Sequence, residues 1–294
     1  MDTLRQFNLA MQYIEAHLEE SIDFATVAQI AGCTEYHFRR VFSFLAHISL
    51  SEYVRRRRLS LAAAALRESN LRIIDLAVRY GYDSADAFTR AFQALHGVTP
   101  SEAREEDVPL KSFPPMTFQL TVRGGEGMDY RIVEKDAFSI VGLHKRIELI
   151  YKGINPEIAD MWNSLTEEDI ELLSILSDLQ PQGIVNASVN FADDRAEGTT
   201  LDHYIGVATT QPHHDKWQVL PVAASLWVVF TVKGKFPEAT QDVWSRIYGE
   251  WLVTSGYEVN YGPEILWVDH ETWDMPEVHS EIWIPIKRKT PQEP

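Results

Sequence analysis

The hydrophobic positions of the first hundred residues repeat with the period of an α-helix, and one part of that pattern occurs twice. Between Phe38 and Leu45 the apolar residues fall at i, i+3, i+4 and i+7, which is the spacing of one helical face. The stretch from Phe88 to Leu95 repeats this stripe 50 positions later. The pattern therefore predicts two short amphipathic helices of the same kind.

Each of these helices follows a shorter apolar segment that ends at a glycine. The first segment covers residues 24–31 and precedes Gly32, and the second covers residues 73–80 and precedes Gly81. A helix, a tight turn with glycine and a second helix with a polar or basic outer face form the helix-turn-helix pattern. Two copies in register predict two helix-turn-helix units and double-stranded DNA as a partner.

A longer helix is predicted between the two copies, over about residues 50–68. Ser49 and Glu52 form a capping-box pair at its start, and its middle is rich in alanine. A helix of about 19 residues spans roughly 28 Å. This length approaches the spacing of roughly 34 Å between successive major-groove faces, so one chain could place both recognition helices on one side of a duplex.

Candidate DNA contacts come from the outward positions of the two recognition helices and from an arginine run on the connecting helix. Alternatively, the run 55–58 is a solvated face, and its members point in successive 100° directions, so not all four can face DNA. Asp86 would repel phosphate unless it accepts a hydrogen bond from a cytosine amino group. The candidates are Tyr36, Arg39, Arg40, Arg55, Arg57, Arg58, Ser84, Ala85, Asp86, Thr89 and Arg90.

The pattern changes from helical to strand-like in the second part of the chain. A boundary region over residues 105–127 contains prolines and glycines, and residues 116–123 alternate like a strand. After it, strand, helix, strand and strand occur twice, which predicts an α+β domain with an antiparallel sheet and helices on one face. The expected strands are 130–133, 138–146, 183–190, 203–210, 222–232, 264–268 and 280–286, and the expected helices are 156–165, 167–176 and 237–255.

Residues 5–104 resemble the DNA-binding domain of the AraC/XylS family of bacterial transcription regulators. The likeness is carried by the second helix-turn-helix unit and its exit; His47 stands where a glycine is common in the first unit. The second part resembles the GyrI-like, effector-binding domain. The matching stretches are 74–77, 81–82, 88–92, 97–100 and Arg104 for the first family, and 204–207, Pro237, 247–251, 255–257 and 281–287 for the second.

The two resemblances together imply an all-α double helix-turn-helix domain followed by a pseudo-symmetric α+β domain. The expected boundaries are residues 1–106 for the DNA-binding domain, 107–127 for a connecting segment and 128–294 for the effector-binding domain.

The second resemblance implies a cleft along the pseudo-two-fold axis that binds small, often cationic, aromatic molecules. The glutamate that binds the ligand in that family corresponds to Glu281. Alternation along the strand puts Glu281, Trp283 and Pro285 on one side, where an acid beside an aromatic ring suits a lipophilic cation. The expected ligand contacts are Glu281, Trp283, Tyr204, Trp227, Trp244, Tyr248 and Trp251, although strand and helix aromatics also commonly belong to a core.

The formal charge of −16 is distributed unevenly along the chain. Through Arg104 there are 12 Lys and Arg against 12 Asp and Glu, and after it 15 against 31, so the whole acidic excess lies in the second part. DNA affinity depends on local phosphate contacts, not on total charge. The acidic part could attract cations.

Other features exclude several classes of function. Cys33 is the single cysteine, so the sequence predicts no disulfide framework and no cysteine zinc cluster. The pair His213–His214 is better explained as a solvated loop than as a metal site. No run of 18 apolar residues and no phosphate-binding or dinucleotide motif occurs, so we expect no membrane span, no cofactor and a cytoplasmic location.

These observations predict a ligand-responsive transcription regulator that binds DNA, a small-molecule effector and RNA polymerase. Two alternatives stay open for the second domain. It could hydrolyse a reactive small molecule, with Glu281 and a neighbouring tyrosine as acid or base. It could instead serve only to bind a protein partner, and the absence of a deep pocket would favour that reading.

Overall fold

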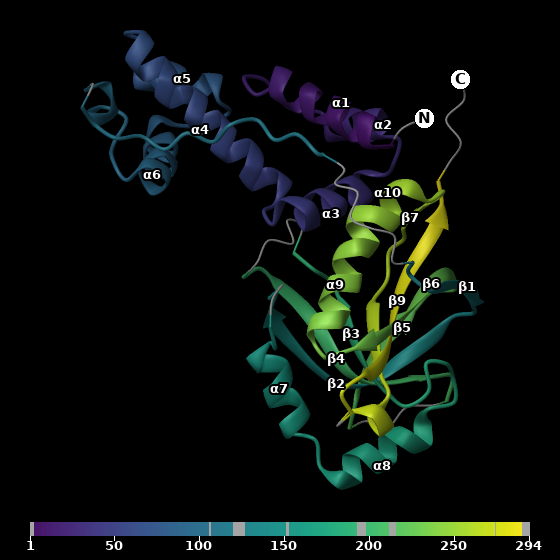
Figure 1. Ribbon diagram of the computed structural model, residues 1–294. Helices are drawn as coiled ribbons and strands as arrows, with labels where there is room; N and C mark the ends of the chain where they lie inside the picture. The colour runs from purple at the N-terminus through teal and green to yellow at the C-terminus, as the bar shows by residue number, and fades with distance from the viewer. Residues whose placement is uncertain are drawn as a thin grey trace. The chain divides into compact units, whose positions relative to one another are not determined.

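The computed structural model describes residues 3–105, 107–119, 127–150, 153–192, 198–211, 216–273 and 275–289 (Figure 1). The chain divides into two compact units. The first, called the helical unit here, contains residues 1–38 and 49–122; the second, called the sheet unit, contains residues 39–48 and 123–294.

The helical unit follows the predicted double pattern. Polar side chains begin three of its helices: Asp23 accepts from the backbone of Ala25, Ser49 from Glu52 and Ser84 from Ala87. Its elements, including a third helix that continues into the sheet unit, are α1 (Thr3–Ala16), α2 (Phe24–Ala31), α3 (Glu35–Ala46), α4 (Leu50–Glu68), α5 (Ile73–Arg79), α6 (Ala85–His96) and a 3-10 turn (Glu102–Arg104).

The core of the second helix-turn-helix confirms the predicted stripe. Phe88 and Phe92 are fully buried, and Leu95 is nearly so. They pack with Leu59 and Leu66 of α4, so the connecting helix is part of the same hydrophobic cluster.

The expected strand over residues 116–123 is wrong for its described part. Residues 107–108 form a turn, and residues 109–119 run on without pairing with any strand. Their backbone groups bond to helix side chains instead: Met116 donates to the hydroxyl of Tyr53, and Phe118 donates to the side chain of Asn8. Residues 120–123 lie outside the described residues.

The sheet unit contains one antiparallel sheet with helices between its strands. Its strands are β1 (Tyr130–Lys135), β2 (Phe138–Glu148), β3 (Ile184–Val189), β4 (Thr200–Thr209), β5 (Gln218–Val222), β6 (Ser225–Gly234), β7 (Tyr257–Val259), β8 (Glu264–Val268) and β9 (Val278–Arg288). Its helices are α7 (Pro156–Asn163), α8 (Glu167–Leu176), α9 (Glu238–Arg246), a π-helical segment (Ile247–Trp251), α10 (Leu252–Thr254) and a 3-10 turn (His270–Thr272).

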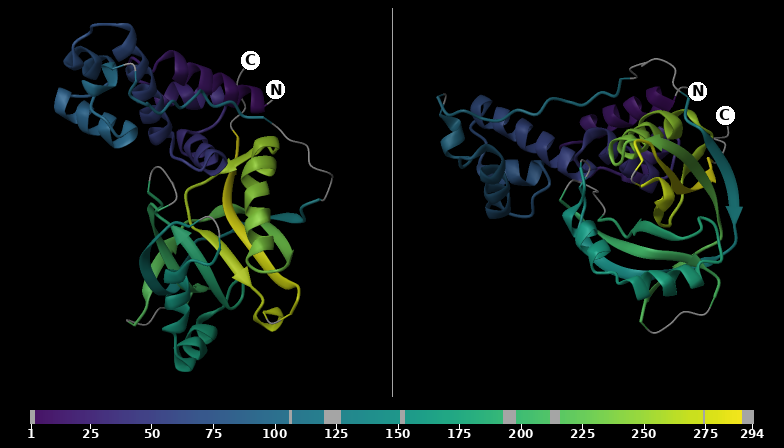
Figure 2. Two further views of the ribbon diagram at one scale, coloured as in Figure 1. Left: turned by 60° about the vertical axis from the view of Figure 1, so that its left-hand side comes forward. Right: turned by 60° about the horizontal axis from the view of Figure 1, so that its bottom comes forward.

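The strand order, β1-β6-β9-β8-β3-β4-β2-β5, has an internal symmetry that confirms the predicted pseudo-symmetric fold. β3 and β8 meet in the middle. The first half continues outward from β3 through β4 and β2, and the second half continues outward from β8 through β9 and β6. The first strand of each half is exchanged: β1 pairs with β6 of the second half, whereas β5 pairs with β2 of the first half. This exchange ties the halves into one curved sheet (Figure 2).

The sequence pattern missed two short strands and one helical irregularity. β5 contains a proline and β7 has only 3 residues, so neither gives a clear alternation. The predicted helix 237–255 is present, but its middle widens into a π-helix. The pair His213–His214 lies outside the described residues.

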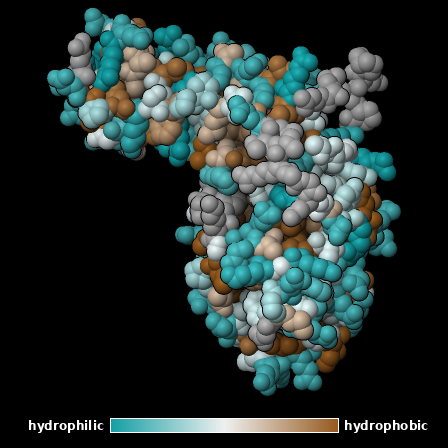
Figure 3. Space-filling model, viewed as in Figure 1, coloured by the Kyte–Doolittle hydropathy of each residue, from teal (hydrophilic) through white to brown (hydrophobic). Residues whose placement is uncertain are grey.

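The two faces of the sheet are buried in different clusters. On one face, Met161 of α7 and Leu173 of α8 pack on Val141 and Ile205 of the sheet. On the other, Trp227 and Trp283 form a cluster with apolar strand residues. On the face of the molecule drawn in Figure 3, hydrophobic residues lie scattered among polar ones.

Gly142 and Gly206 face each other across β2 and β4, and their backbones approach very closely. A Cβ atom on Gly142 would lie 2.2 Å from the carbonyl oxygen of Ile205, which is backbone and cannot turn away. We therefore expect Gly142→Ala to destabilise the protein by more than about 3 kcal/mol, as overpacking against rigid neighbours does. Chemical denaturation of the full chain measures the change.

The matched control is Gly256→Ala, because a Cβ there meets nothing within 4 Å. We expect that substitution to change the free energy of unfolding by less than about 0.5 kcal/mol. Equal effects of the two substitutions would show that the close approach of β2 and β4 is not a constraint on the fold.

Candidate ligand pocket and DNA-binding surface

Helix α6 carries the candidate DNA-contacting surface that agrees best with the sequence pattern. Asp86 and Arg90 are exposed on it, and Ala85 and Thr89 are half-buried. Ser84 is exposed but its hydroxyl caps the helix, so its side chain already has a structural role. Gln93 continues the exposed face by one turn and was not among the predicted contacts. Its spacing of three residues from Arg90 could have indicated that it lies on the same helical face.

The outer face of α3 is less available than predicted. Tyr36 and Arg39 are half-buried. Arg40 is buried, and within the sheet unit its guanidinium forms an ion pair with Glu264. The prediction of an exposed Arg40 is therefore wrong for this conformation, because a buried carboxylate holds the side chain.

The arginine run on α4 is mostly structural. Arg57 is buried, pairs with Glu15 at 2.7 Å and donates to the carbonyl oxygen of Phe113. Its predicted role as a phosphate contact is wrong, since its donors are used inside the protein. Arg55 is 39% exposed and pairs with Glu52, so it remains a surface candidate.

Arg58 is half-buried and is bound to backbone groups of the helical unit. Its guanidinium donates to the carbonyl oxygens of Leu18 and Glu20, at 2.8 and 2.6 Å. It lies against the turn of the second helix-turn-helix, where Gly81 has φ +79° and a Cβ atom would come within 2.7 Å of the guanidinium. Arg58 therefore joins the end of α1 to this turn, and its predicted contact with phosphate is wrong here.

The sheet unit contains a cavity of about 640 Å³ between α7, α9 and the middle of the sheet. Such a volume is typical of small-molecule sites. Strands β3, β4 and β8 form its floor, and the segment after β2 borders it. Its lining includes Ile147, Leu149, Ile158, Trp162, Ile184, Asn186, Ser188, Leu201, His203, Phe236, Thr240, Gln241, Trp244, Tyr248, Glu264, Leu266, Val268 and Trp273.

Three polar residues form a row across the floor. In the strand registers, Ser188 of β3 is paired with His203 of β4 on one side and with Glu264 of β8 on the other. Directly paired residues share a face of the sheet, so all three side chains lie on the cavity side.

Glu264 is the buried acid of this cavity, with only 4% of its surface exposed. Its carboxylate accepts hydrogen bonds from the hydroxyl of Tyr248 at 3.0 Å and from the indole of Trp244 at 3.1 Å. A buried carboxylate requires such partners, because an unpaired one would be costly. Trp244 and Tyr248 are four residues apart along continuous helical segments, so they lie on one face and both donors reach the same carboxylate.

On the other side of the row, His203 is held neutral. Its two ring nitrogens lie 3.0 Å from the hydroxyl of Ser188 and 3.3 Å from the side-chain oxygen of Asn186. That oxygen also accepts from the indole of Trp162 at 3.0 Å. Burial, and secondarily the nearby His144, lowers the pKa of His203 to about 4.

The prediction that Glu281 lines the ligand cleft is wrong in the described structure. Glu281 pairs across the strands with Trp267, which follows the cavity-facing Leu266 and therefore points to the opposite face. There its carboxylate forms an ion pair with Arg131 at 2.8 Å and accepts from the indole of Trp283. The predicted grouping of Glu281 with Trp283 was correct, but that group lies on the other side of the sheet.

The aromatic candidates divide between the two faces. Trp244 and Tyr248 line the cavity. Tyr204 and Trp227 belong to the cluster on the opposite face, and Trp251 packs on Phe230 at 5.4 Å between ring centroids. The predicted contacts of these three with the ligand, and that of Trp283, are therefore not made in this cavity.

The sequence contained a signal for Glu264 that was not used. An acid begins an otherwise apolar strand at Glu264, just as one interrupts the strand at Glu281. Only the register of β8 decides which acid faces the helices.

Comparison with known proteins separates the chain into two matched regions. Residues 27–106 match the helix-turn-helix domain family, and residues 131–286 match the family of integron-associated effector binding proteins. The transcriptional activator AarP of Providencia stuartii is 39% identical over 95 residues, which are 32% of this chain and 70% of AarP.

Two further proteins are similar to one part of the chain each. The right origin-binding protein of Escherichia coli is 37% identical over 89 residues, covering 30% of this chain and 31% of that protein. The structure of SAV2435 bound to tetraphenylphosphonium aligns with 54% of this chain and 94% of its own, at 21% identity and a TM-score of 0.44.

Among these relatives, AarP is described as a transcriptional activator and SoxS of Salmonella typhimurium as a regulatory protein. Among the described residues no helix has the length and apolar character needed to cross a membrane. The same residues contain no cluster of histidine, cysteine and acidic side chains that could hold a metal ion.

The lowered pKa of His203 predicts a loss of stability in mild acid. The unfolded histidine binds its proton near pH 6.5, whereas the folded one resists protonation until about pH 4. Between these values the unfolded state binds more protons, so stability falls as the pH is lowered through this window. The total loss from this one group is on the order of 3 kcal/mol.

Thermal unfolding of the full chain at several pH values tests this expectation. His203→Gln keeps hydrogen-bonding capacity without a titratable ring, so its stability should fall less between pH 6.5 and 4 than that of the unsubstituted protein. Parallel pH profiles for the two proteins would contradict a buried neutral His203.

Proposed function

Because this chain belongs to the family of integron-associated effector binding proteins and carries the helix-turn-helix domain of AraC-type DNA-binding transcription regulators, we propose that a small lipophilic cation, bound in the cavity of the sheet unit, modulates its affinity for DNA. The observation that carries the proposal is the buried carboxylate of Glu264 at the floor of a cavity with mostly apolar walls.

The chemistry of the cavity favours a cation with an aromatic or aliphatic body. Trp244 and Tyr248 present their rings and direct their polar hydrogens toward Glu264. Charge pairing with the carboxylate and contact with these rings together suit a desolvated cation. Such a ligand competes with the guanidinium of Arg40 for the carboxylate of Glu264.

Among the described residues, the opposite side of the floor offers no charged partner to a second positive group. His203 is neutral near pH 7 and is hydrogen-bonded to Ser188. The ligand is thus a monocation whose body lies over the neutral side of the row. The cavity volume of about 640 Å³ also favours a small molecule over a site that only docks a protein partner.

The ligand acts on DNA binding through a difference in affinity between two states of the protein. A ligand with equal affinity for both states would shift neither. We place the base and phosphate contacts on the exposed face of α6, together with Tyr36 and Arg39 of α3. As a regulator of transcription, the protein acts in the cytoplasm and meets RNA polymerase at its promoter.

Glu264→Gln should lower the affinity for a lipophilic cation at least tenfold, because a neutral amide replaces the charged partner. Isothermal titration with tetraphenylphosphonium on the full chain measures this, and triphenylphosphine oxide serves as the uncharged control ligand. The unsubstituted protein should prefer the cation over the oxide, and the variant should lose that preference.

The matched control is Glu281→Gln, the same substitution on the opposite face of the sheet. We expect it to leave cation affinity within about twofold of the unsubstituted value, since Glu281 is bonded to Arg131 outside the cavity. A large loss in Glu281→Gln together with no loss in Glu264→Gln would show that the ligand binds the other face.

Arg90→Ala should weaken specific DNA binding by about 1–3 kcal/mol if this exposed arginine reads a base, with a smaller loss on non-specific DNA. Gel-shift titration on a site selected from random duplexes measures both. The control is Arg72→Ala, whose exposed side chain pairs with Asp75 in the helix that precedes the turn. Unchanged affinity in Arg90→Ala would exclude α6 as the reading helix.

A further inference from the structure

The extended segment that follows the double helix-turn-helix is bound along its length to the helical unit. We call residues 107–119 the strap. It lies outside both regions that match known families, which end at residue 106 and begin again at residue 131. Pro109, Pro114 and Pro115 hold it extended and remove backbone donors that would otherwise need partners.

At its beginning the strap is joined to the second helix-turn-helix. The backbone of Lys111 donates to Nδ1 of His96, and Nε2 of the same ring lies 3.3 Å from the carbonyl oxygen of Leu59 on α4. Burial lowers the pKa of His96, which agrees with a neutral ring that accepts at one nitrogen and donates at the other. His96 thereby joins the strap, α6 and α4 at a single point.

In its middle the strap crosses α4 at Phe113. The backbone nitrogen of Phe113 donates to the hydroxyl of Ser60 at 3.0 Å, and its carbonyl accepts from Arg57. The ring of Phe113 packs on the hydrophobic cluster of the second helix-turn-helix, with the guanidinium of Arg56 5.2 Å from its centroid.

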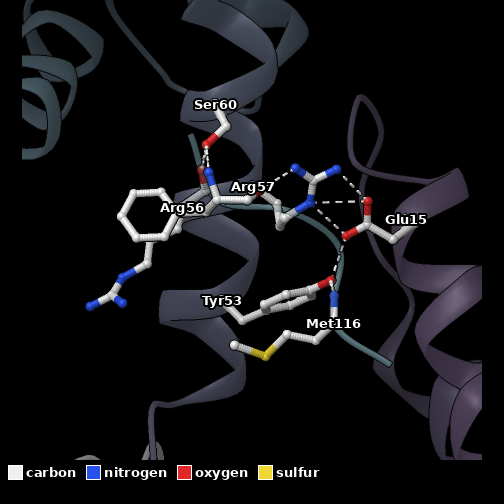
Figure 4. A network of polar contacts seen from close by, with 7 residues as sticks. Glu15, Tyr53, Arg56, Arg57, Ser60 and Met116 are labelled. Atoms are coloured by element: carbon white, nitrogen blue, oxygen red, sulfur yellow. Dashed lines mark hydrogen bonds and ion pairs between the residues drawn. The ribbon is translucent and has the colours of Figure 1, made fainter. Parts of the chain in front are cut away.

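A carboxylate on α1 orients the side chains that hold this part of the strap (Figure 4). Glu15 accepts from the hydroxyl of Tyr53 at 2.6 Å and from Arg57 at 2.7 and 2.9 Å. Tyr53 in turn accepts from the backbone of Met116 at 3.1 Å. Glu15 does not touch the strap; it acts through Tyr53 and Arg57.

The strap ends on α1, where the side-chain amide of Asn8 makes two hydrogen bonds to the backbone of Phe118. Asn8 accepts from the backbone nitrogen of Phe118 at 2.8 Å and donates to its carbonyl oxygen at 3.0 Å. The ring of Phe118 also makes an edge contact with Phe7 at 6.1 Å. The strap therefore runs from α6, along α4, to α1.

The contacts on α4 lie on one face of that helix. Tyr53, Arg57 and Ser60 are spaced by four and three residues, as neighbours on a helical surface are. We propose that the strap is a splint that fixes α1 and α6 against α4, and so sets the spacing of the DNA half-sites that the two helix-turn-helix units can read together. Glu15 and Asn8 are positioning residues for this spacing.

This role rests on DNA binding by the helical unit but not on the ligand of the sheet unit. If α4 alone fixed the spacing, the strap would be dispensable, because this continuous helix already joins the two helix-turn-helix units. The strap adds hydrogen bonds that connect α1 and α6 to α4. These bonds limit the rotation of either helix-turn-helix unit about its end of α4. If the two helix-turn-helix units are held rigidly, a change in half-site spacing lowers the affinity for DNA strongly. If they can rotate relative to α4, the same change lowers the affinity less.

The first measurement is hydrogen exchange by mass spectrometry on the full-length protein. Glu15→Gln and Asn8→Ala should each raise the exchange rate of peptides covering residues 110–119 at least fivefold. Glu19→Gln is the matched control: it removes the same charge just beyond α1, where Glu19 pairs with the exposed Arg79 and not with the strap. That variant should exchange at the unsubstituted rate in this segment.

The second measurement is DNA affinity for a selected site and for the same site with one base pair inserted between its half-sites. The unsubstituted protein and Glu19→Gln should lose at least tenfold in affinity on insertion, and Glu15→Gln and Asn8→Ala less than threefold. A tenfold or greater loss in all four proteins, with fast exchange in the strap of the two variants, would overturn the proposal. Failure of the unsubstituted protein to select any site would instead contradict DNA binding itself.

Because Glu15→Gln also removes a partner of the buried Arg57, that variant could unfold. Asn8→Ala avoids this, since Asn8 bonds only backbone groups at the far end of the strap among the contacts described. Loss of spacing selectivity in Asn8→Ala alone, at an unchanged melting temperature, supports the splint; unchanged selectivity in a folded Asn8→Ala with an open strap contradicts it.

Discussion

The cavity of the sheet unit is organised around one buried carboxylate, that of Glu264. Glu264 stands on the central strand β8 at the floor of a cavity with mostly apolar walls. An ion in such surroundings is tolerated only with good partners, and Tyr248 and Trp244 supply hydrogen bonds to it. The two donors are four residues apart on one helical face, so a single helix supplies both hydrogen bonds to the acid.

Pairing of β3 with β8 puts this acid at the junction of the two halves. The exchange of β1 and β5 between the halves makes the sheet continuous on both sides of that junction. Because each half contributes one strand to the middle, the floor carries different chemistry on its two sides. Neutral His203 lies on one side of Ser188 and anionic Glu264 on the other. A pseudo-symmetric scaffold therefore holds an asymmetric site.

Much of the helical unit could be predicted from the sequence, because its signals are local. Caps at Asp23, Ser49 and Ser84 and the repeated apolar stripe define its helices without reference to distant residues. The arginine run on α4 could not be assigned in this way. Whether Arg57 faces DNA or Glu15 depends on a helix more than 40 residues away in sequence.

The choice between Glu281 and Glu264 shows the same limit for the sheet. Alternation along β9 correctly grouped Glu281 with Trp283, but periodicity within one strand cannot say which side the helices cover. That information lies in the register between β8 and β9, which is set by pairing of distant segments. The strand predicted over residues 116–123 was wrong for a related reason: in its described part, Met116 and Phe118 bond to polar side chains of helices instead of a neighbouring strand.

The account depends most on a free-energy coupling between the cavity and the DNA-binding helices. Fluorescence anisotropy can measure the dissociation constant for a selected duplex with and without saturating lipophilic cation, and the cation's dissociation constant can be measured with and without DNA. Linkage requires that the cation change the dissociation constant for DNA by the same factor by which DNA changes the dissociation constant for the cation. We expect this factor to lie between about 5 and 150. A cation that binds at Glu264 while leaving the affinity for DNA unchanged would contradict the account.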